Sequence, residues 1–316
     1  MKMKLSIVIP VFNELESLPK LIIELKKVLK IFDSWEVIFV DDGSSDKSDK
    51  WLSELSQKED NFYLIQFYRN YGKSAALSEG FKAASGQYVI TLDADLQDDP
   101  EEIKNLVNKL DEGWDLVSGW KKKRLDPLNK TLPSKIFNFV TRFFTGVKIH
   151  DFNCGIKGYK QSVIKSLDIY GGRHRYIPAL AGHKKFKITE IVVNHREREF
   201  GETKYGGSRI FHGFFDLITI LFLNKYNKQP LHLFGFIGLI FLTGGIISES
   251  ILLYYKYALG HFFKDHVALL MFGVMLIVIG IQFFSIGLLG ELFIKYNQHS
   301  DSRIKKRIFK NKNLQS

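Results

Sequence analysis

Residues 88–102, with the sequence YVITLDADLQDDPEE, predict a strand, an acidic turn and a helix in immediate succession. The apolar run YVITL leads into Asp93-Ala94-Asp95, and Gln97 follows two residues later. The stretch Asp99-Pro100-Glu101-Glu102 predicts a helix start of the capping-box type, with proline at the first helical position. A strand that ends in carboxylates and leads into a helix is one βα unit, and sheets built from such units bind ligands beyond the carboxyl ends of their strands.

The same alternation extends over the first 120 residues. Apolar residues recur at helical spacing after Ser17, a predicted N-cap, and Gly86 and Gly113 stand where later helices would end. The strand-like runs are residues 5–11, 35–40, 63–67, 88–92 and 116–119. This order predicts an α/β fold in which a mostly parallel sheet is covered by helices on both faces.

Carboxylates follow two of these strands: Asp41 and Asp42 come after the second strand, and Asp93 and Asp95 come after the fourth. The chain contains neither the G-x-G-x-x-G dinucleotide fingerprint nor the P-loop pattern, so neither glycine-rich route to phosphate binding is available. Carboxylates repel phosphates unless a divalent cation lies between them. The hard oxygen ligands of Asp93, Asp95 and Gln97 suit Mg²⁺ or Mn²⁺ shared with a diphosphate. Ordinary loop or capping roles are the alternative for an isolated D-x-D.

The composition excludes a disordered or collagen-like chain. Of the 316 residues, 45% are hydrophobic and 14% aromatic, and the formal net charge is +11. Residues 292–316 hold seven basic side chains and one acid, so +6 of this charge lies in a short tail, and a nucleic-acid partner is not expected. The tail either attracts anionic lipids or is a solvated extension. Cys154 is the single cysteine, which excludes an internal disulfide and indicates a packing residue.

Two apolar segments predict transmembrane helices, with buried core helices as the alternative. Residues 231–255 contain one charged side chain, Glu249, and residues 267–290 contain none. At the helical rise each segment reaches about 36 Å, enough to cross a hydrocarbon core of about 30 Å. Basic residues flank the pair on its outer sides, so both termini are expected in the cytoplasm.

Gly273, Gly280 and Gly287 recur every seven residues and predict a face for close packing against the first span or a neighbouring subunit, which leaves a homo-oligomer open. Glu249 is either a functional group or reaches water near the outer interface.

Phenylalanine-rich stripes with basic borders predict two interfacial helices that hold the domain against a bilayer. Core helices of the soluble domain are the alternative. The first stripe consists of Ile136, Phe137, Phe139, Val140, Phe143 and Phe144, and the second of Ile210, Phe211, Phe214, Phe215, Ile218, Leu221 and Phe222. The expected organisation is a cytoplasmic α/β domain (1–209), a juxtamembrane amphipathic helix and linker (210–230), a transmembrane hairpin (231–291) and a basic cytoplasmic tail (292–316).

Several motifs in this order resemble the polyprenyl-phosphate glycosyltransferases of glycosyltransferase family 2. They include SIVIPVFNE (6–14), FVDDGSSD (39–46), RNYGKSAAL (69–77), DADLQDDPE (93–101), DFNCGIKGY (151–159) and RHRYIPALAG (173–182). The similarity continues through residues 195–207 and the apolar hairpin. That group includes dolichyl-phosphate mannose synthases and bacterial undecaprenyl-phosphate glycosyltransferases. The resemblance implies the glycosyltransferase A-type fold and transfer of a sugar from a nucleotide sugar to a lipid phosphate.

The resemblance also implies roles for individual residues. The nucleotide-sugar contacts would be Pro10, Phe12, Glu14, Asp41, Asp42, Lys73, Asp93, Ala94, Lys121 and Arg124. The groups that carry the chemistry would be Asp95, Asp151, Arg198 and Lys204. The metal ligands would be Asp93, Asp95 and Gln97, and the lipid-phosphate contacts Arg175 and Arg209. The family often has Ser at Thr203 and Arg at Lys121, so Arg124 is an alternative to Lys121. If the resemblance is set aside, the alternatives are ordinary packing for the apolar residues of this set and solvated surface positions for the charged ones.

The acceptor simplifies the expected mechanism. A lipid phosphomonoester has its second pKa near 6, so it is largely a dianion at neutral pH and can attack without a strong base. Asp151 is then expected either to act as a base or to orient a sugar hydroxyl. Direct attack inverts the anomeric centre. We expect a metal-dependent, inverting hexosyltransferase of the inner membrane that uses a UDP-hexose or UDP-N-acetylhexosamine and undecaprenyl phosphate for cell-envelope glycans. The alternatives are transfer from GDP-mannose to dolichyl phosphate and a catalytically silent membrane scaffold.

Overall fold

The computed structural model describes residues 4–122, 128–167, 169, 171, 173–196, 219 and 229–296. The chain divides into two compact units, Met1–Leu221 and Phe222–Ser316. The predicted boundary at 209/210 lies outside the described residues, since 197–218 and 220–228 are not described, and the boundaries at 230/231 and 291/292 stay predictions.

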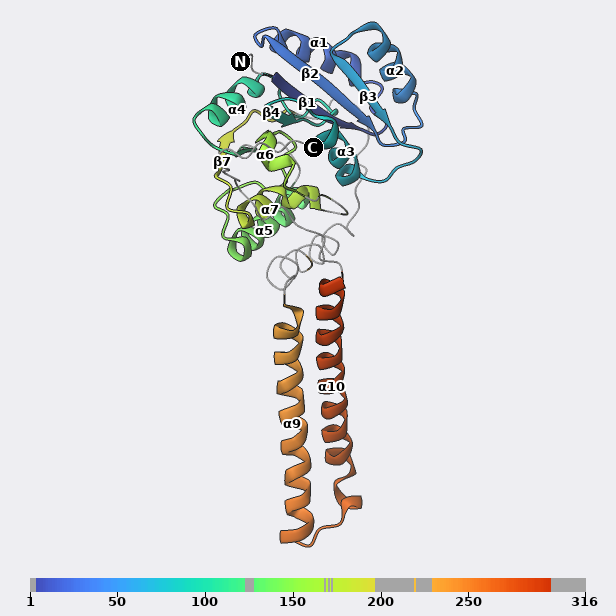
Figure 1. The fold of residues 1–316 in the computed structure, drawn as a ribbon, viewed down its shortest axis with the longest axis vertical. Coiled ribbons are helices and arrows are strands. Elements are labelled where there is room, and N and C mark those ends of the chain that lie inside the picture. Colours follow the sequence, from blue (N-terminus) through green and yellow to red (C-terminus); the bar gives the residue numbers. More distant parts are fainter. Residues whose placement is uncertain are drawn as a thin grey trace, which may run out of the picture. The chain divides into compact units, whose positions relative to one another are not determined.

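The first unit alternates strands and helices along the chain (Figure 1). Its first half contains β1 (Lys4–Val11), α1 (Leu18–Leu29), β2 (Ser34–Asp41), α2 (Ser48–Lys58), β3 (Phe62–Gln66), α3 (Lys73–Ala83) and β4 (Tyr88–Thr91). Its second half contains α4 (Glu102–Asp111), β5 (Leu116–Trp120), α5 (Leu128–Thr145), β6 (Lys157–Lys160), α6 (Gln161–Ile164), the 3₁₀ helix η1 (Arg173–Tyr176), α7 (Ile177–His183) and β7 (Ile188–Val192). All five predicted strands are confirmed.

The strands form one seven-stranded sheet in the order β3-β2-β1-β4-β6-β5-β7. Strands β1, β2, β3 and β4 pair in parallel, as does β5 with β7. Strand β6 is inserted antiparallel between β4 and β5, with Thr91 opposite Lys157 and Ser118 opposite the same lysine. The sequence prediction contained neither β6 nor β7. Because β1, β2 and β4 are parallel neighbours, their carboxyl ends meet at one edge of the sheet.

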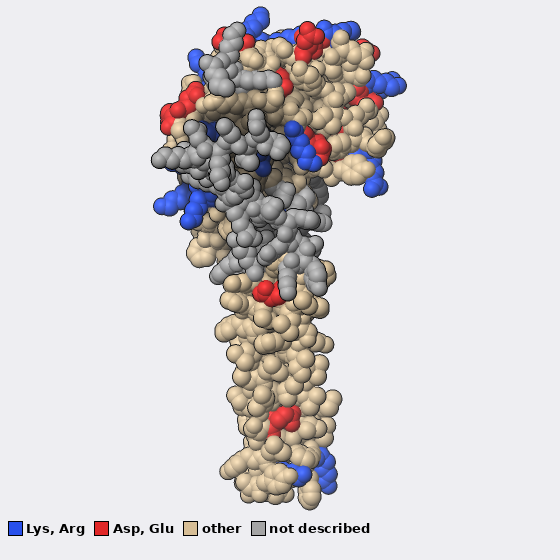
Figure 2. All heavy atoms as spheres, in the orientation of Figure 1, with Lys and Arg blue, Asp and Glu red and all other residues tan. Residues whose placement is uncertain are grey.

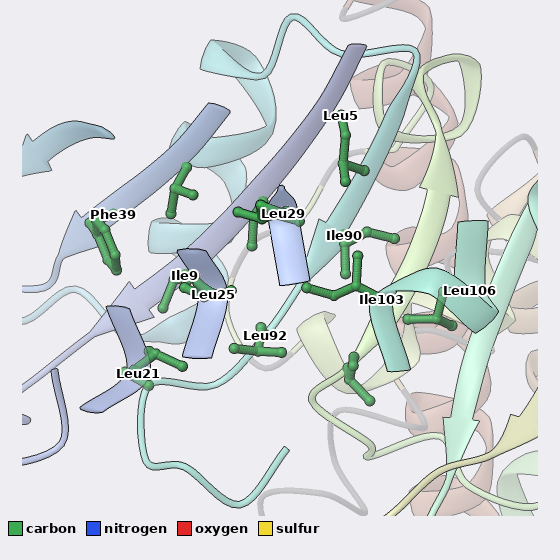
Figure 3. Close-up of a cluster of buried hydrophobic side chains, with 14 of the residues drawn as sticks. Leu5, Ile9, Leu21, Leu25, Leu29, Phe39, Ile90, Leu92, Ile103 and Leu106 are labelled. Atoms are coloured by element: carbon green, nitrogen blue, oxygen red, sulfur yellow. The ribbon is translucent and has the colours of Figure 1, made fainter. Parts of the chain in front are cut away.

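Alternating side chains of the strands face two helical layers. One layer consists of α1, α2 and α4, which pack on the face that carries Ile9 and Ile90 (Figure 3). In that view Leu21 and Leu25 of α1 and Ile103 of α4 point toward these strands. The other layer consists of α3, α6 and α7 and covers the opposite face. Each such buried apolar side chain contributes about 1.5–3 kcal/mol, so both faces of the sheet are held firmly.

Two predicted helix caps are wrong in detail. Helix α1 begins at Leu18 as expected, but the Ser17 hydroxyl donates to the Glu14 carbonyl (2.9 Å) and makes no cap hydrogen bond. The capping box before α4 does not form. Asp99 Oδ1 still accepts the Glu101 N–H (3.1 Å), a local bond, but Glu102 Oε1 accepts the Asn194 N–H (3.1 Å), so a tertiary contact takes the side chain that would have closed the box.

The second unit is a hairpin of α9 (Pro230–Ala258) and α10 (Val267–Tyr296), joined through the 3₁₀ helix η2 (Phe263–His266). Both helices have the length and composition to cross a membrane. Only 22% of the most apolar window of the first and 11% of that of the second is buried, so these are not core helices of a soluble domain. Figure 2 shows the hairpin surface as almost wholly uncharged along its length.

Glycines bring the two helices of the hairpin close together. A β-carbon on Gly238 would lie 2.8 Å from the Gly280 carbonyl oxygen, and one on Gly245 would lie 2.8 Å from that of Gly273. Gly287 packs against Leu231 in the same way. The predicted glycine face of the second span therefore packs on the first span of the same chain.

Candidate active site

The loop after β1 is bound to the loop after β2. The Asn13 N–H donates to Ser44 Oγ (2.9 Å), and the Ser45 N–H donates back to Asn13 Oδ1 (2.8 Å). The Glu14 N–H donates to Ser48 Oγ (3.1 Å). These bonds hold the predicted base and ribose contacts, all of them half-buried, next to the carboxyl end of β2. Those contacts are Pro10, Phe12 and Glu14.

Asp41 and Asp42, at the end of β2, are buried and hold the surrounding loops. Asp42 accepts the Tyr71 N–H at Oδ1 (2.7 Å) and the Gly72 N–H at Oδ2 (2.9 Å), and so positions the start of α3. Asp41 Oδ1 accepts the Ser44 N–H (3.3 Å). Burial raises the pKa of both carboxyls above the ordinary value, although these hydrogen bonds oppose the shift. Their contact with a nucleoside stays a prediction.

The loop after β4 presents oxygen ligands on its open side. Asp93, Asp95 and Gln97 are half-buried, whereas Ala94 and Leu96 between them are buried. The Gln97 N–H donates to Asp95 Oδ1 (3.2 Å), which fixes the turn. Within the described ranges no three His, Cys, Asp or Glu side chains converge to hold a metal alone. One or two carboxylates plus substrate phosphates suffice for Mg²⁺, so these residues fit an ion shared with a diphosphate.

Three lysines surround this loop. Lys73 at the start of α3 forms an ion pair with Asp93 Oδ1, and Lys121 after β5 pairs with the fully buried Asp98 (2.8 Å). Lys157 of β6 is buried and donates to the Cys154 carbonyl. The three lysines stand against the three carboxylates of this loop, Asp93, Asp95 and Asp98, so the acidic charge beside a bound polyphosphate would be largely offset.

Electrostatic coupling within this cluster shifts several ionisation equilibria. Burial alone would raise the pKa of Asp93, but Lys73 and Lys121 hold it below the ordinary value. Burial opposes protonation of Lys73 as well, yet Asp93 raises the pKa of that ammonium. For Lys157, burial prevails and lowers the pKa. Lys73 and Asp93 are therefore both charged at neutral pH, in direct contact.

The opposite wall is the loop between α5 and β6, which carries Asp151. Ser118 Oγ donates to the Asp151 carbonyl (3.2 Å), and Thr91 Oγ1 donates to the Gly155 carbonyl (2.9 Å). Gly155 leaves no room for a side chain, since a β-carbon there would lie 2.5 Å from Oδ2 of Asp93 and 2.5 Å from Oδ2 of Asp98. Glycine is therefore required where this loop meets the carboxylates. The role of Asp151 in the chemistry stays a prediction.

A segment after β7 runs beside the loop that follows β4. His195 forms an antiparallel bridge with Asp98, and the Arg196 N–H donates to the Gln97 carbonyl (3.0 Å). The Arg196 guanidinium pairs with Glu24 of α1 (2.6 Å) and with Asp99 (2.8 Å). This double ion pair fixes the point from which the chain continues toward the predicted Arg198 and Lys204.

Helix η1 is attached to the start of α3. The His174 backbone N–H donates to Ser74 Oγ (3.1 Å), and the Ser74 hydroxyl contacts His174 Nδ1 (2.9 Å). Burial lowers the pKa of His174 well below its ordinary value, and Lys73 adds to this shift. The neighbouring Arg175 is half-buried with its Nε shielded from solvent and lacking a hydrogen bond within the described residues. Its contact with a lipid phosphate stays a prediction.

Comparison with known proteins identifies the fold and the family. Residues 6–168 match the family model described as glycosyl transferase family 2. The chain belongs to glycosyltransferase family 2. The undecaprenyl-phosphate 4-deoxy-4-formamido-L-arabinose transferase of Salmonella choleraesuis (strain SC-B67) is 38% identical over 308 residues, which cover 97% of this chain and 92% of that protein. The transferase of the same name from Salmonella paratyphi B (strain ATCC BAA-1250 / SPB7) gives the same values. The resemblance of this glycosyltransferase to polyprenyl-phosphate glycosyltransferases is thereby confirmed.

Solved structures show the same fold. Glucosyl-3-phosphoglycerate synthase from Mycobacterium tuberculosis, crystallised with Mn²⁺ and UDP-glucose, superimposes with a TM-score of 0.54 at 18% identity and covers 70% of this chain and 79% of its own. Its complex with phosphoglyceric acid also gives a TM-score of 0.54 at 18% identity, over 70% and 80% of the two chains. The expected glycosyltransferase A-type fold is confirmed.

The described part of the glycosyltransferase brings most predicted donor-site residues to one sheet edge. Asp98, Lys157 and Arg196 were not predicted, although Asp98 follows the D-x-D by three residues and Lys157 is a charge within a buried stretch. Four predicted residues lie outside the described residues. These are Arg124, Arg198, Lys204 and Arg209.

Proposed function

We propose that this chain transfers a sugar from a UDP-linked donor, a UDP-hexose or UDP-N-acetylhexosamine, to undecaprenyl phosphate. The single observation that carries the proposal is the cluster of Asp93, Asp95 and Gln97 beside Lys73, at the carboxyl ends of parallel strands, in a chain similar over 97% of its length to an undecaprenyl-phosphate sugar transferase. The product would be a lipid-linked sugar for the cell envelope.

Asp93, Asp95 and Gln97 are the residues that would hold Mg²⁺ or Mn²⁺. When bound, the ion would neutralise negative charge that develops on the departing nucleoside diphosphate. Lys73 and Lys121 would add positive charge on the two sides of the same loop. The half-buried Phe12 and Glu14, with Asp42 behind them, would receive the base and ribose.

The acceptor is itself the nucleophile in this proposal. The dianionic lipid phosphate attacks the anomeric carbon, a new C–O bond forms, and the bond to the diphosphate breaks on the opposite face, which inverts the centre. Asp151, held by Ser118 at its carbonyl, would orient a sugar hydroxyl or accept a proton. Arg198 and Lys204, which continue from the anchored Arg196, would meet the charge of the phosphates.

The exposed phenylalanines of α5 support a site at the membrane surface. Phe139, Phe143 and Phe144 are 68%, 74% and 57% exposed, whereas Phe137 and Val140 pack into the domain. The first predicted stripe thus divides into a core side and an exposed apolar side, and the latter would enter the lipid interface. Together with α9 and α10 it would hold the domain at the cytoplasmic face of the inner membrane, with both termini in the cytoplasm.

The decisive experiment offers labelled nucleotide sugars to the purified full-length protein with undecaprenyl phosphate in detergent. The panel would contain UDP-glucose, UDP-N-acetylglucosamine, UDP-4-deoxy-4-formamido-L-arabinose and GDP-mannose. Label should enter organic solvent with one UDP sugar, and Asp95→Asn or a chelator should abolish transfer. Asp60→Asn, an equal charge change on an exposed loop, should leave transfer intact. Full transfer by Asp95→Asn, or no transfer from any donor, would refute the proposal.

A further inference from the structure

The ion pair between Lys73 and Asp93 occupies the position that a metal would need. Asp93 has two carboxylate oxygens. Oδ2 lies against the backbone of Gly155, where even a β-carbon would come within 2.5 Å, and Oδ1 is paired with Lys73. Because Oδ2 is closed off by the opposite wall, Oδ1 is the oxygen open to a cation. A divalent ion that binds Asp93 through Oδ1 therefore competes with the Lys73 ammonium for the same oxygen.

Lys73 differs from the two other lysines of the cluster in its freedom to move. Lys121 is bound to Asp98, which is fully buried, and Lys157 is buried with its amine on the Cys154 carbonyl. The Lys73 side chain is 28% exposed and stands at the first turn of α3, and its Asp93 partner is 31% exposed. A partly exposed lysine on a flexible four-carbon side chain can exchange one anionic partner for another at little cost in packing.

We propose that Lys73 is a stand-in cation for Asp93 in the metal-free protein and moves to the donor diphosphate when metal and nucleotide bind. The inference rests on the proposed function, because it assumes that a nucleoside diphosphate is the second anion. Without nucleotide, metal binding leaves Lys73 with no anionic partner in direct contact. With nucleotide, the diphosphate accepts the displaced ammonium. Metal and nucleotide therefore strengthen each other's binding, and by linkage the gain is equal in both directions.

The coupling can be measured by binding alone, without acceptor lipid. Free Mn²⁺ is titrated by electron paramagnetic resonance against the full-length protein in detergent, with and without UDP. The wild type should bind Mn²⁺ weakly alone and more tightly with UDP. Lys73→Gln removes the competing cation, so it should bind Mn²⁺ alone about tenfold more tightly, and the gain from UDP should shrink by the same factor. The same variant should also bind UDP more weakly when Mn²⁺ is present, because it lacks the ammonium that would pair with the diphosphate.

Two matched variants separate this role from a general charge effect. Lys82→Gln makes the same charge change on α3, at an exposed lysine paired with Glu79, and should behave as wild type. Lys73→Arg keeps the charge and should bind Mn²⁺ alone as weakly as wild type. The proposal is overturned if Lys73→Gln binds Mn²⁺ no more tightly than wild type, if Lys73→Arg binds as tightly as Lys73→Gln, or if UDP does not affect Mn²⁺ binding. Coupled binding without sugar transfer would support this inference and refute the proposed reaction.

Discussion

Gly155 offers a direct test of how the two walls of the site meet. In Gly155→Ala the new methyl group would lie 2.5 Å from Oδ2 of Asp93 and of Asp98, whereas ordinary contacts begin at 3.4 Å, so it must gain about 0.9 Å from both carboxylates. Asp98 is fully buried and paired with Lys121, and the Gly155 carbonyl is bound to Thr91. A small shift of the Gly155 loop away from Asp98 leaves Asp93, which is 31% exposed, to take up most of the displacement.

Displacement of Asp93 should affect turnover more than folding. A misplacement of about 1 Å in a reacting assembly costs about 10²-fold in rate, or about 2.7 kcal/mol of transition-state stabilisation. Overpacking of this size destabilises a protein by about 1–3 kcal/mol, so the domain should remain folded with a lower thermal midpoint.

The assay is the initial rate of label transfer to undecaprenyl phosphate, with circular dichroism and thermal unfolding as folding controls. Gly244→Ala, where the β-carbon would meet only Leu276 Cδ1 at 3.6 Å, is the matched control and should retain the wild-type rate and midpoint. If Gly155→Ala is folded and transfers sugar within about twofold of wild type, the contact between the walls does not position Asp93, and the reasoning is wrong.

Three further outcomes follow from the described contacts. Burial raises the pKa of Cys154 to about 12, so the native thiol should resist iodoacetamide at pH 8 and react only after denaturation, and rapid native labelling would contradict this. The pKa of His174 is lowered in the folded state, so the unfolded chain binds more protons below about pH 6.5 and stability should fall as the pH drops from 7 to 5. His174→Gln should show a smaller drop in thermal midpoint over that range, and an unchanged drop would argue against the assignment. Gly280→Ala would place a methyl 2.6 Å from Leu242 Cγ, so the hairpin should lose about 1–3 kcal/mol in thermal unfolding, whereas Gly244→Ala should not.

The sequence was most informative where burial dictates composition. Strands β1, β2 and β4 are runs of buried apolar residues, and their predicted bounds agree with the structure to within a residue at each end. The D-x-D loop could be located for the same reason, since a carboxylate directly after a buried strand stands out. The amphipathic α1 was equally plain from its spacing.

Strand β6 could not be found in this way. It has four residues, KGYK, with a lysine at each end and no apolar run, and its strand character comes from insertion between β4 and β5. The buried Lys157 resembles a surface lysine in the sequence, because the fold closes over it, turns its amine to the nearby Cys154 carbonyl and brings Asp93 of another segment close to it. The capping box failed for a related reason, as Asp99 and Glu102 bind the segment that begins at Asn194.

The four-residue β6 has a consequence for how the protein tolerates change. Its ladder with β4 aligns Thr91 with Lys157 and Val89 with Tyr159, and these four side chains lie on one face of the sheet, because residues two apart in a strand point the same way. A slip of one residue would turn Lys157 outward and bring Gly158 into its place. Lys157 and the Gly155 loop would then both be displaced relative to Asp93, although every strand could still be paired, so evolutionary insertions or deletions should be confined to the stretches beyond this short ladder.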